Sequence, residues 1–284
     1  MRSSKLSPAR AGFTLVEVMV ALVLGTIVVG FILQFVTGQT RIASRQTARE
    51  EVQQNARGAL EVVASDLRGA IASGLIVGGE QEIRFMLPRR WGVVCTGNGS
   101  TQTTAVFPVL PGDAVPFGPG TGLVVHRAAT NTWAPAVPTL ATVTARAGAS
   151  LTDPTGCGAL APSGVVEAFT FTGERHPAVT RGDRIAVYQL VRYDVGASQG
   201  RNWIRRSNGA GIEDSNMQPL AGPVDSVGFA YLGGTPAVEM AAPGAGAAAA
   251  GVTMVRFGIK TSSRSSVNGA PVTESGSVTV QIRN

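Results

Sequence analysis

The chain has 284 residues, of which 44% are hydrophobic and 15% charged, so it is long enough to bury a substantial core. Its 36 glycines, 16 prolines and few aromatic residues are typical of short strands and turns rather than a helical bundle. The net charge is +6, and 6 − 3 leaves +3 when the three basic residues of residues 1–12 are set aside. The other arginines are scattered and not interleaved with aromatic residues, which argues against direct nucleic-acid binding.

The first predicted element is a helix of membrane length. Phe13 to Val36 is a run of 24 residues with one charged side chain, Glu17. As a helix the run is about 36 Å long, which is enough to cross a bilayer. A secretory signal peptide has a shorter apolar core with small residues after it, whereas here Ala11 and Gly12 precede the core. The run therefore predicts a transmembrane segment.

The stretch RAGFTLVEVMVAL, residues 10–22, resembles the class III signal of type IV prepilins. The resemblance covers residues 7 to roughly 40 and rests on a short basic leader, then Gly12, then Phe13-Thr14-Leu15-Val16-Glu17. It implies that prepilin peptidase removes residues 1–12 by cleaving between Gly12 and Phe13, and then N-methylates Phe13. The alternative is an ordinary single-pass anchor that keeps its leader.

Glu17 would be the fifth residue of the processed chain. A lone acid in a bilayer costs about 2.5–3.5 kcal/mol on insertion scales. A helix N-terminus and a cationic α-amine offset that cost. In the pilin family the amine belongs to a neighbouring subunit, which implies that Glu17 sets the register of assembly. The local alternative is that Glu17 binds the amine of its own chain, because Phe13 lies four residues earlier on the same helix face.

Charge alone leaves the orientation open. Three basic residues in the leader favour a cytoplasmic N-terminus, but Arg41, Arg45 and Arg49 follow the span on its other side. The prepilin resemblance implies a cytoplasmic N-terminus and a periplasmic head. The chain would be a single-pass protein of the bacterial inner membrane, and later part of a pilus at the cell surface.

The helical pattern continues beyond the span, through residues 37–72. Apolar residues recur there at spacings of three and four, at Val52, Ala56, Leu60, Val63, Leu67 and Ile71. This pattern predicts an amphipathic helix with one buried stripe. Because residues 13–72 contain no proline, we expect one helix of roughly 60 residues, about 90 Å long.

Residues 73–284 change to a strand pattern, which predicts a β-rich head. The predicted strands are 82–87, 122–128, 164–172, 183–195, 201–207, 224–232, 252–261 and 276–283. Alternating apolar residues, as in 183–195, favour an antiparallel sheet with one face covered, and the helix stripe is the natural cover. The Gly/Pro/Ala-rich stretches 96–121 and 233–251 are predicted loops.

Cys95 and Cys157 are the only cysteines. An even pair in an exported domain suggests one disulfide. It would close a loop of about 62 residues and stabilise the head by roughly 3–4.7 kcal/mol on the chain-entropy estimate. The alternative is two unpaired buried thiols. Two cysteines without nearby histidines do not make a zinc site, and we expect neither a metal nor a cofactor.

The C-terminal part carries a second resemblance, over roughly residues 183–284. LVRYDV, RNWIRRS, MQPLAGPVDSVGFAYL, VTMVRFGIKTSS and the final VTVQIRN are similar to a group of minor pilins. The group includes PilW-like minor pilins of type IV pili and J-type minor pseudopilins of type II secretion, and the ending QIRN favours the pilus. The resemblance implies an α+β pilin-like roll without catalytic activity. Its partners would be other minor pilins, the major pilin and an inner-membrane assembly platform, and the group would prime pilus assembly in a tip complex.

A membrane-anchored periplasmic hydrolase is the competing class. GASQG at 196–200 matches G-x-S-x-G, with Ser198 as the nucleophile. That elbow needs a strand, a sharp turn and a helix, whereas a predicted strand follows here, so a hairpin is favoured. The only histidines, His126 and His176, have no motif around them, and nothing favours a catalytic triad.

Overall fold

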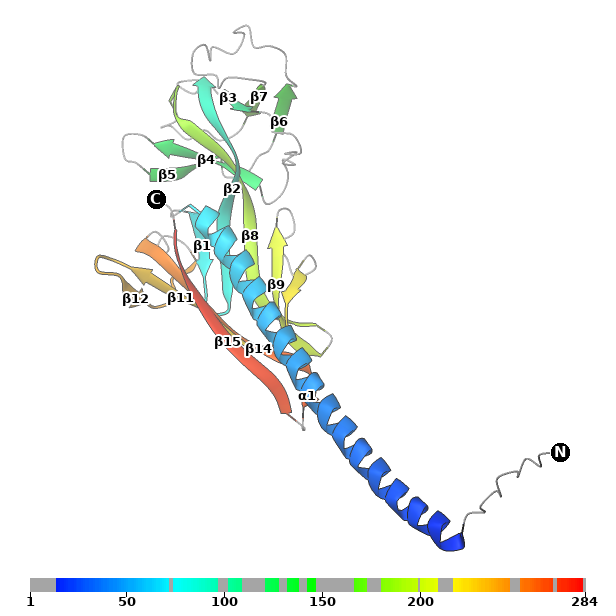
Figure 1. Ribbon diagram of the computed structural model, residues 1–284. Coiled ribbons are helices and arrows are strands. Elements are labelled where there is room, and N and C mark those ends of the chain that lie inside the picture. Colours follow the sequence, from blue (N-terminus) through cyan, green and yellow to red (C-terminus); the bar gives the residue numbers. More distant parts are fainter. Residues whose placement is uncertain are drawn as a thin grey trace, which may run out of the picture.

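The computed structural model describes residues 14–71, 74–96, 102–108, 121–127, 132–137, 142–146, 166–172, 180–198, 200–208, 217–245, 251–267 and 270–282. A single long helix, α1, carries a β-rich head on its C-terminal half, while its N-terminal half extends away from the head (Figure 1). The predicted α+β layout, a long N-terminal apolar helix followed by antiparallel sheets, is confirmed and is consistent with a pilin-like fold.

Helix α1 spans Leu15–Gly69, 55 residues without interruption, so the expectation of one continuous helix is confirmed with slightly shorter ends. Thr14 caps its start in an extended conformation, and its side chain accepts a hydrogen bond from the backbone N–H of Glu17. At the other end Ala70 returns to an extended conformation, and its N–H donates to the carbonyl of Leu67. The helix therefore ends where the chain must turn back into the head.

The two halves of α1 differ in burial. Every residue from Thr14 to Thr47 is exposed, and the first buried residue is Ala48. The buried residues beyond it recur at helical spacing, at Ala48, Val52, Ala56, Ala59, Val63, Ala64 and Leu67. The predicted amphipathic stripe is thus confirmed, with alanines added to it and with Leu60 only partly buried.

The head contains two antiparallel sheets. The larger one has eleven strands in the order β10 (Gln218–Ala221), β9 (Arg201–Asn208), β8 (Arg184–Ser198), β2 (Glu82–Thr96), β3 (Gln102–Pro108), β7 (Val166–Thr172) and β6 (Thr142–Arg146). Off this path, β1 (Leu75–Gly78) pairs with β2 and β13 (Gly244–Ala245), and β4 (Thr121–Arg127) pairs with β8 and β5 (Thr132–Val137). The smaller sheet is ordered β12 (Val238–Met240), β11 (Val224–Gly233), β14 (Val252–Val267) and β15 (Ala270–Gln281).

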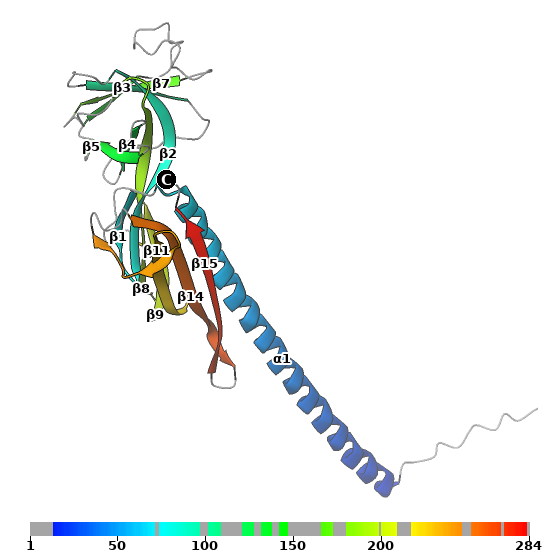
Figure 2. The same ribbon diagram turned by 90° about the vertical axis from the view of Figure 1, so that its left-hand side faces the viewer.

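Strands β2 and β8 are the long elements that connect the two ends of the head. They pair from Glu82 with Asp194 to Val93 with Arg184, with a register shift between Pro88 and Arg90. One half of this pair lies beside α1, and the other half carries β3, β4 and their neighbours beyond the end of the helix (Figures 1 and 2). The head therefore has a helix-proximal part and a helix-distal part.

One hydrophobic core joins α1 to both sheets. It contains the buried residues of α1 from Ala56 to Leu67, the inward side chains of β1, β2, β8, β9 and β10, and those of β11, β14 and β15. The largest fully buried side chains are Tyr193, Tyr231, Phe85, Phe257, Leu67, Ile83, Leu123, Ile185, Ile204, Val52 and Val63. A second small cluster, of Ile71, Val124, Ala186 and Tyr188, continues the core into the helix-distal part.

Each of the eight predicted strands overlaps an observed one, but the two predicted loops are partly wrong. The stretch 96–121 contains β3, and 233–251 contains β12 and β13. Strand β3 holds the β-branched and aromatic residues of QTTAVFP, and it pairs with β2 and β7 along its length. These stretches were predicted as loops because glycines and prolines surround the short strands. Strands β1, β5, β6 and β10 were also not predicted.

Candidate assembly site

The candidate site is the first turn of α1 together with the apolar surface that follows it. Glu17 is exposed in this turn, at the third helical position after the Thr14 cap. The Glu17 N–H lies 3.3 Å from the Thr14 hydroxyl oxygen, and the Val18 N–H donates to the Thr14 carbonyl at 3.2 Å. The predicted cleavage residues Gly12 and Phe13 lie outside the described residues.

The pattern Thr14-x-x-Glu17 is that of a capping box, which sequence reasoning did not use although the signal was present. The hydrogen bond to Thr14 forms one half of such a box. The negative side chain also lies near the positive end of the helix dipole, which stabilises it by about 0.3–1 kcal/mol. Glu17 thus has a local role at the helix start, and its exposed carboxylate can still accept hydrogen bonds from a cation outside the helix.

The surface around Glu17 is apolar on all sides of the helix. Large hydrophobic residues are exposed along α1 from Leu15, which is 77% exposed, through Phe31 at 69% to Ile42 at 52%. By length and composition α1 is the one helix among the described residues that could cross a membrane. An apolar surface of this extent is not stable in water, because burying each such side chain is worth roughly 1.5–3 kcal/mol.

Polar contacts fix the other half of α1 to the head. Asp66 accepts hydrogen bonds from the Tyr193 hydroxyl at 2.7 Å and from the Arg206 guanidinium at 2.8 and 3.0 Å. Burial and the neighbouring Asp66 carboxylate raise the pKa of Tyr193 far above its ordinary value. Nearer the exposed half, the Thr261 hydroxyl donates to the Val52 carbonyl at 3.1 Å. The helix is thereby held in one rotation relative to the sheets.

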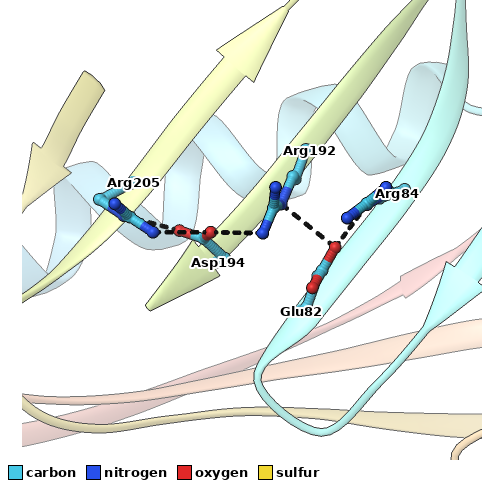
Figure 3. A network of polar contacts seen from close by, with 5 residues as sticks. All are labelled: Glu82, Arg84, Arg192, Asp194 and Arg205. Carbon is cyan, nitrogen blue, oxygen red and sulfur yellow. Dashed lines mark hydrogen bonds and ion pairs between the residues drawn. The ribbon is translucent and has the colours of Figure 1, made fainter. Parts of the chain in front are cut away.

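A row of alternating charges crosses β9, β8 and β2 (Figure 3). Asp194 is bound by Arg205 at 2.8 and 2.9 Å and by Arg192 at 3.0 Å, and Arg192 also contacts Glu82 at 3.1 Å. Arg84 pairs with Glu82 at the end of the row. Each acid lies between two guanidinium groups, so the row ties three strands together. It offers no cation site, and no cluster of metal-binding side chains occurs within the described ranges.

Ser198 and His126 are not brought together, because His126 pairs with Arg184 at one end of β8 and Ser198 lies at the other end. Ser198 ends β8 and pairs with Arg201 of β9 across a hairpin, as predicted, so the strand that follows replaces the helix that an elbow needs. The Ser198 carbonyl accepts from the Trp203 indole N–H at 3.0 Å. His126 lies on β4 with its ring 4.8 Å from that of Trp133, and His176 lies outside the described residues.

Cys95 ends a buried stretch of β2, with 1% of its surface exposed. It is held in a disulfide rather than as a free thiol. Cys157 lies outside the described residues, so the predicted Cys95–Cys157 pairing stays a prediction.

Comparison with known proteins bears on the same N-terminal segment. The family model for the prokaryotic N-terminal methylation motif matches residues 7–33. The chain carries a prepilin signal. The matched residues include the predicted cleavage point, Glu17 and most of the exposed apolar half of α1. No curated protein and no solved structure matches the chain.

The prepilin signal has direct consequences for the chain. The motif implies processing by prepilin peptidase and assembly with other pilins on a membrane platform. Together with the exposed apolar helix it indicates a single-pass, membrane-anchored protein of the type IV pilin or pseudopilin kind, which is a structural and non-enzymatic group. The match does not extend into the head, so the minor-pilin group suggested by residues 183–284 stays a prediction.

Proposed function

We propose that this chain is a PilW-like minor pilin of a bacterial type IV pilus. The observation that supports this most directly is the continuity of α1. One unbroken helix carries the prepilin signal at its start, an apolar half that the head leaves exposed, and a second half that forms part of the core of the head. Such a chain can be stored in a membrane and then moved into a filament without refolding its head.

In this proposal prepilin peptidase cleaves between Gly12 and Phe13 and methylates the new amino group of Phe13. Cleavage leaves a cationic amine two residues before the first helical residue, Leu15. The carboxylate of Glu17 then pairs with the amine of a neighbouring subunit. The pair removes an isolated charge from an apolar environment, and it forms at only one axial offset between the two helices.

In this scheme two environments surround the exposed half of α1 in succession. The inner membrane covers it first, with the N-terminus in the cytoplasm and the head in the periplasm. Apolar helices of other minor pilins and of the major pilin cover it after extraction by the inner-membrane assembly platform. We propose that the chain acts with other minor pilins to prime assembly, and that it remains in a complex at the pilus tip.

The Cys95–Cys157 disulfide is proposed to stabilise the head outside the cytoplasm. The buried and bonded state of Cys95 supports this assignment. Thiol labelling of the denatured, unreduced protein should then find no free thiol, and two labelled thiols per chain would refute the pairing.

Mass spectrometry of the chain extracted from its native membranes tests the proposed function. We expect a mature N-terminus at methylated Phe13 and no residues 1–12. An intact Met1, or a terminus at any other residue, would contradict processing as a prepilin. The presence of the chain in sheared pili then supports the pilus assignment, whereas its absence combined with a secretion defect in a deletion strain would identify a J-type pseudopilin.

A further inference from the structure

Three arginines follow the apolar half of α1 and are not used by the head. Arg41, Arg45 and Arg49 are all exposed, and within the described residues none of them makes an ion pair or a side-chain hydrogen bond. They begin five residues after Val36, the last residue of the apolar run, which is about 7.5 Å along the helix. Arg41 therefore lies where a membrane-spanning helix leaves the hydrocarbon, and Arg45 lies about one helical turn farther out.

These arginines lie on the same side of α1 as the head. Arg41 and Arg45 precede the buried residues Ala48 and Val52 by 48 − 41 and 52 − 45, which is seven residues or about two helical turns in both cases. The helix face that packs on the sheets therefore continues towards the N-terminus, and there it carries guanidinium groups. Strands β14 and β15 extend along the helix in the same direction, towards its exposed half (Figures 1 and 2).

The nearest acids of α1 do not neutralise this face. Glu50 follows Arg41 by nine residues, which places it about half a turn away on the opposite side of the helix. Glu51 is engaged by Arg264 of β14 at 3.4 Å. The cationic face is therefore available to an anionic partner.

We propose that Arg41 and Arg45, the two of these arginines nearest the span, bind the phosphates of anionic lipids at the membrane surface beneath the head. This inference rests on the proposed membrane anchoring. The headgroup layer on each side of the hydrocarbon is about 5–7 Å thick, so Arg41 lies in it or at its edge. Arginine side chains reach several ångströms along the helix, and attraction to a charged surface extends over a Debye length of about 8 Å.

The position of these residues favours lipid over a neighbouring subunit as the partner. In the stored state lipid headgroups surround the helix at this level, because the span is in the bilayer and the head lies farther along the helix. Basic residues beside a span are usually concentrated on its cytoplasmic side. In the proposed orientation Arg41 and Arg45 are on the opposite side, where binding to anionic headgroups gives them a role in holding the depth of the helix before assembly.

The test uses the full chain reconstituted in phosphatidylcholine vesicles with added phosphatidylglycerol, and compares spin-labelled phosphatidylglycerol with spin-labelled phosphatidylcholine. We expect the chain to restrict the motion of phosphatidylglycerol preferentially, and added salt to weaken that preference. The double variant Arg41→Gln/Arg45→Gln should reduce the preference by up to about fivefold for each arginine.

The matched control is Arg57→Gln/Arg68→Gln, which removes two exposed arginines of the same helix from its head-embedded half. It should leave the lipid preference unchanged. An equal loss in the control, or no preference in the wild-type chain, would overturn the inference. So would a double variant that keeps the preference but fails to assemble, because a partner subunit would then be the ligand.

Extraction with alkaline carbonate separates failure of this inference from failure of the proposed anchoring. A chain that stays in the vesicles without a preference for phosphatidylglycerol refutes only the lipid contact. A chain that is extracted by carbonate refutes the anchoring, and the lipid contact with it.

Discussion

The two halves of α1 differ both in apolar content and in what covers their apolar side chains. From Ala48 onward the apolar stripe is covered by the two sheets of the same chain, whereas from Leu15 to Thr47 no residue is buried. In the first half, residues 15–36 are apolar on all sides of the helix and Glu17 is their only charge, whereas the second half is apolar on one side only, with charges opposite the stripe. The difference shows that the head is folded by the second half alone, and that the first half requires a cover from outside the chain.

A comparison of domain stability with burial energy supports this difference between the two halves. A domain is stable by only about 5–15 kcal/mol, while each large apolar side chain left in water forgoes roughly 1.5–3 kcal/mol of burial. The exposed side chains of the first half, from Leu15 to Ile42, would together outweigh the stability of the head. The exposed side chains therefore need a cover from outside the chain, and the prepilin signal suggests that a membrane provides it.

The largest expected effect comes from separating the two halves. Removing residues 1–44 should give a head that stays soluble without detergent and keeps its near-ultraviolet circular dichroism, because no residue before Ala48 is buried against it. The full chain should require detergent or lipid. A truncated head that aggregates or unfolds without cooperativity would show that the exposed half contributes to the fold of the head.

The next prediction concerns Glu17, the only charge in the apolar run from Phe13 to Val36. Glu17→Ala should leave protein level, membrane insertion and cleavage after Gly12 unchanged, because the span becomes more apolar. It should abolish incorporation into pili, since the partner of a neighbouring amine is lost. Glu17→Gln isolates the charge, and Glu61→Gln is the control, an exposed acid of the embedded half without an ion pair among the described residues.

Immunodetection of the chain in sheared pili and in whole cells measures this effect. If Glu17 serves only the capping box and its own amine, both Glu17 variants will still assemble, with a loss in helix stability of about 0.3–1 kcal/mol. Wild-type amounts of both in the pilus fraction would leave the local role standing and remove the role between subunits.

Two leucines, one in each half of α1, test this difference through the stability of the head. Leu67 is 0% exposed in the core, and Leu33 is 61% exposed in the first half. Leu67→Ala should lower the free energy of unfolding of the head by about 2–5 kcal/mol, through lost burial and a cavity. Leu33→Ala should change it by no more than about 0.5 kcal/mol. Urea unfolding of both variants in the same detergent gives the two values, and similar losses would contradict the independence of the halves.

The sequence predicted the helix better than the head for a physical reason. The stripe from Val52 to Ile71 and the run from Phe13 to Val36 depend on local periodicity, which one sequence displays directly. Strand β3 depends on pairing with β7, about sixty positions later, and no local pattern records that contact. The contact of Asp66 with Tyr193 and Arg206 was missed for the same reason, since it joins residues over 100 positions apart.

At the candidate site, the role of Glu17 in assembly stays a prediction, and its local contacts were not predicted. Glu17 was singled out because an acid in an apolar run is costly, and the structure adds that Thr14 caps the same turn. The hairpin at Ser198 was predicted from the strand pattern after it and is confirmed. The order of the two sheets and the shared core were not predictable, because they depend on which strands meet rather than on where strands occur.

The smallest expected effect concerns the contact that fixes the embedded half. The chain has three tyrosines, Tyr188, Tyr193 and Tyr231, and burial raises the pKa of all three. Unfolded tyrosine titrates near pH 10, so the folded state holds its phenolic protons where the unfolded chain releases them. The resulting stability is complete below about pH 10 and is lost as the pH rises further, towards the folded pKa values. Tyrosinate absorbance should therefore stay absent near pH 10 and appear together with unfolding.

Tyr193→Phe sharpens this prediction because, within the described residues, Tyr193 is the one of the three tyrosines with a hydrogen bond to the helix, to Asp66. The variant should lose about 1 kcal/mol of stability at neutral pH, because the hydrogen bond to Asp66 and the one accepted from Arg206 are removed while the two from Arg206 to Asp66 remain. Its stability should then fall less steeply above about pH 10, because one raised pKa is gone. Tyr188→Phe is the control, with the shallower alkaline slope but without the loss from Asp66. Equal losses at neutral pH in both variants would mean that the Tyr193 hydroxyl does not hold the embedded half of α1 against the sheet. Apolar packing alone would then fix that half to the head, and this packing is what the exposed half lacks.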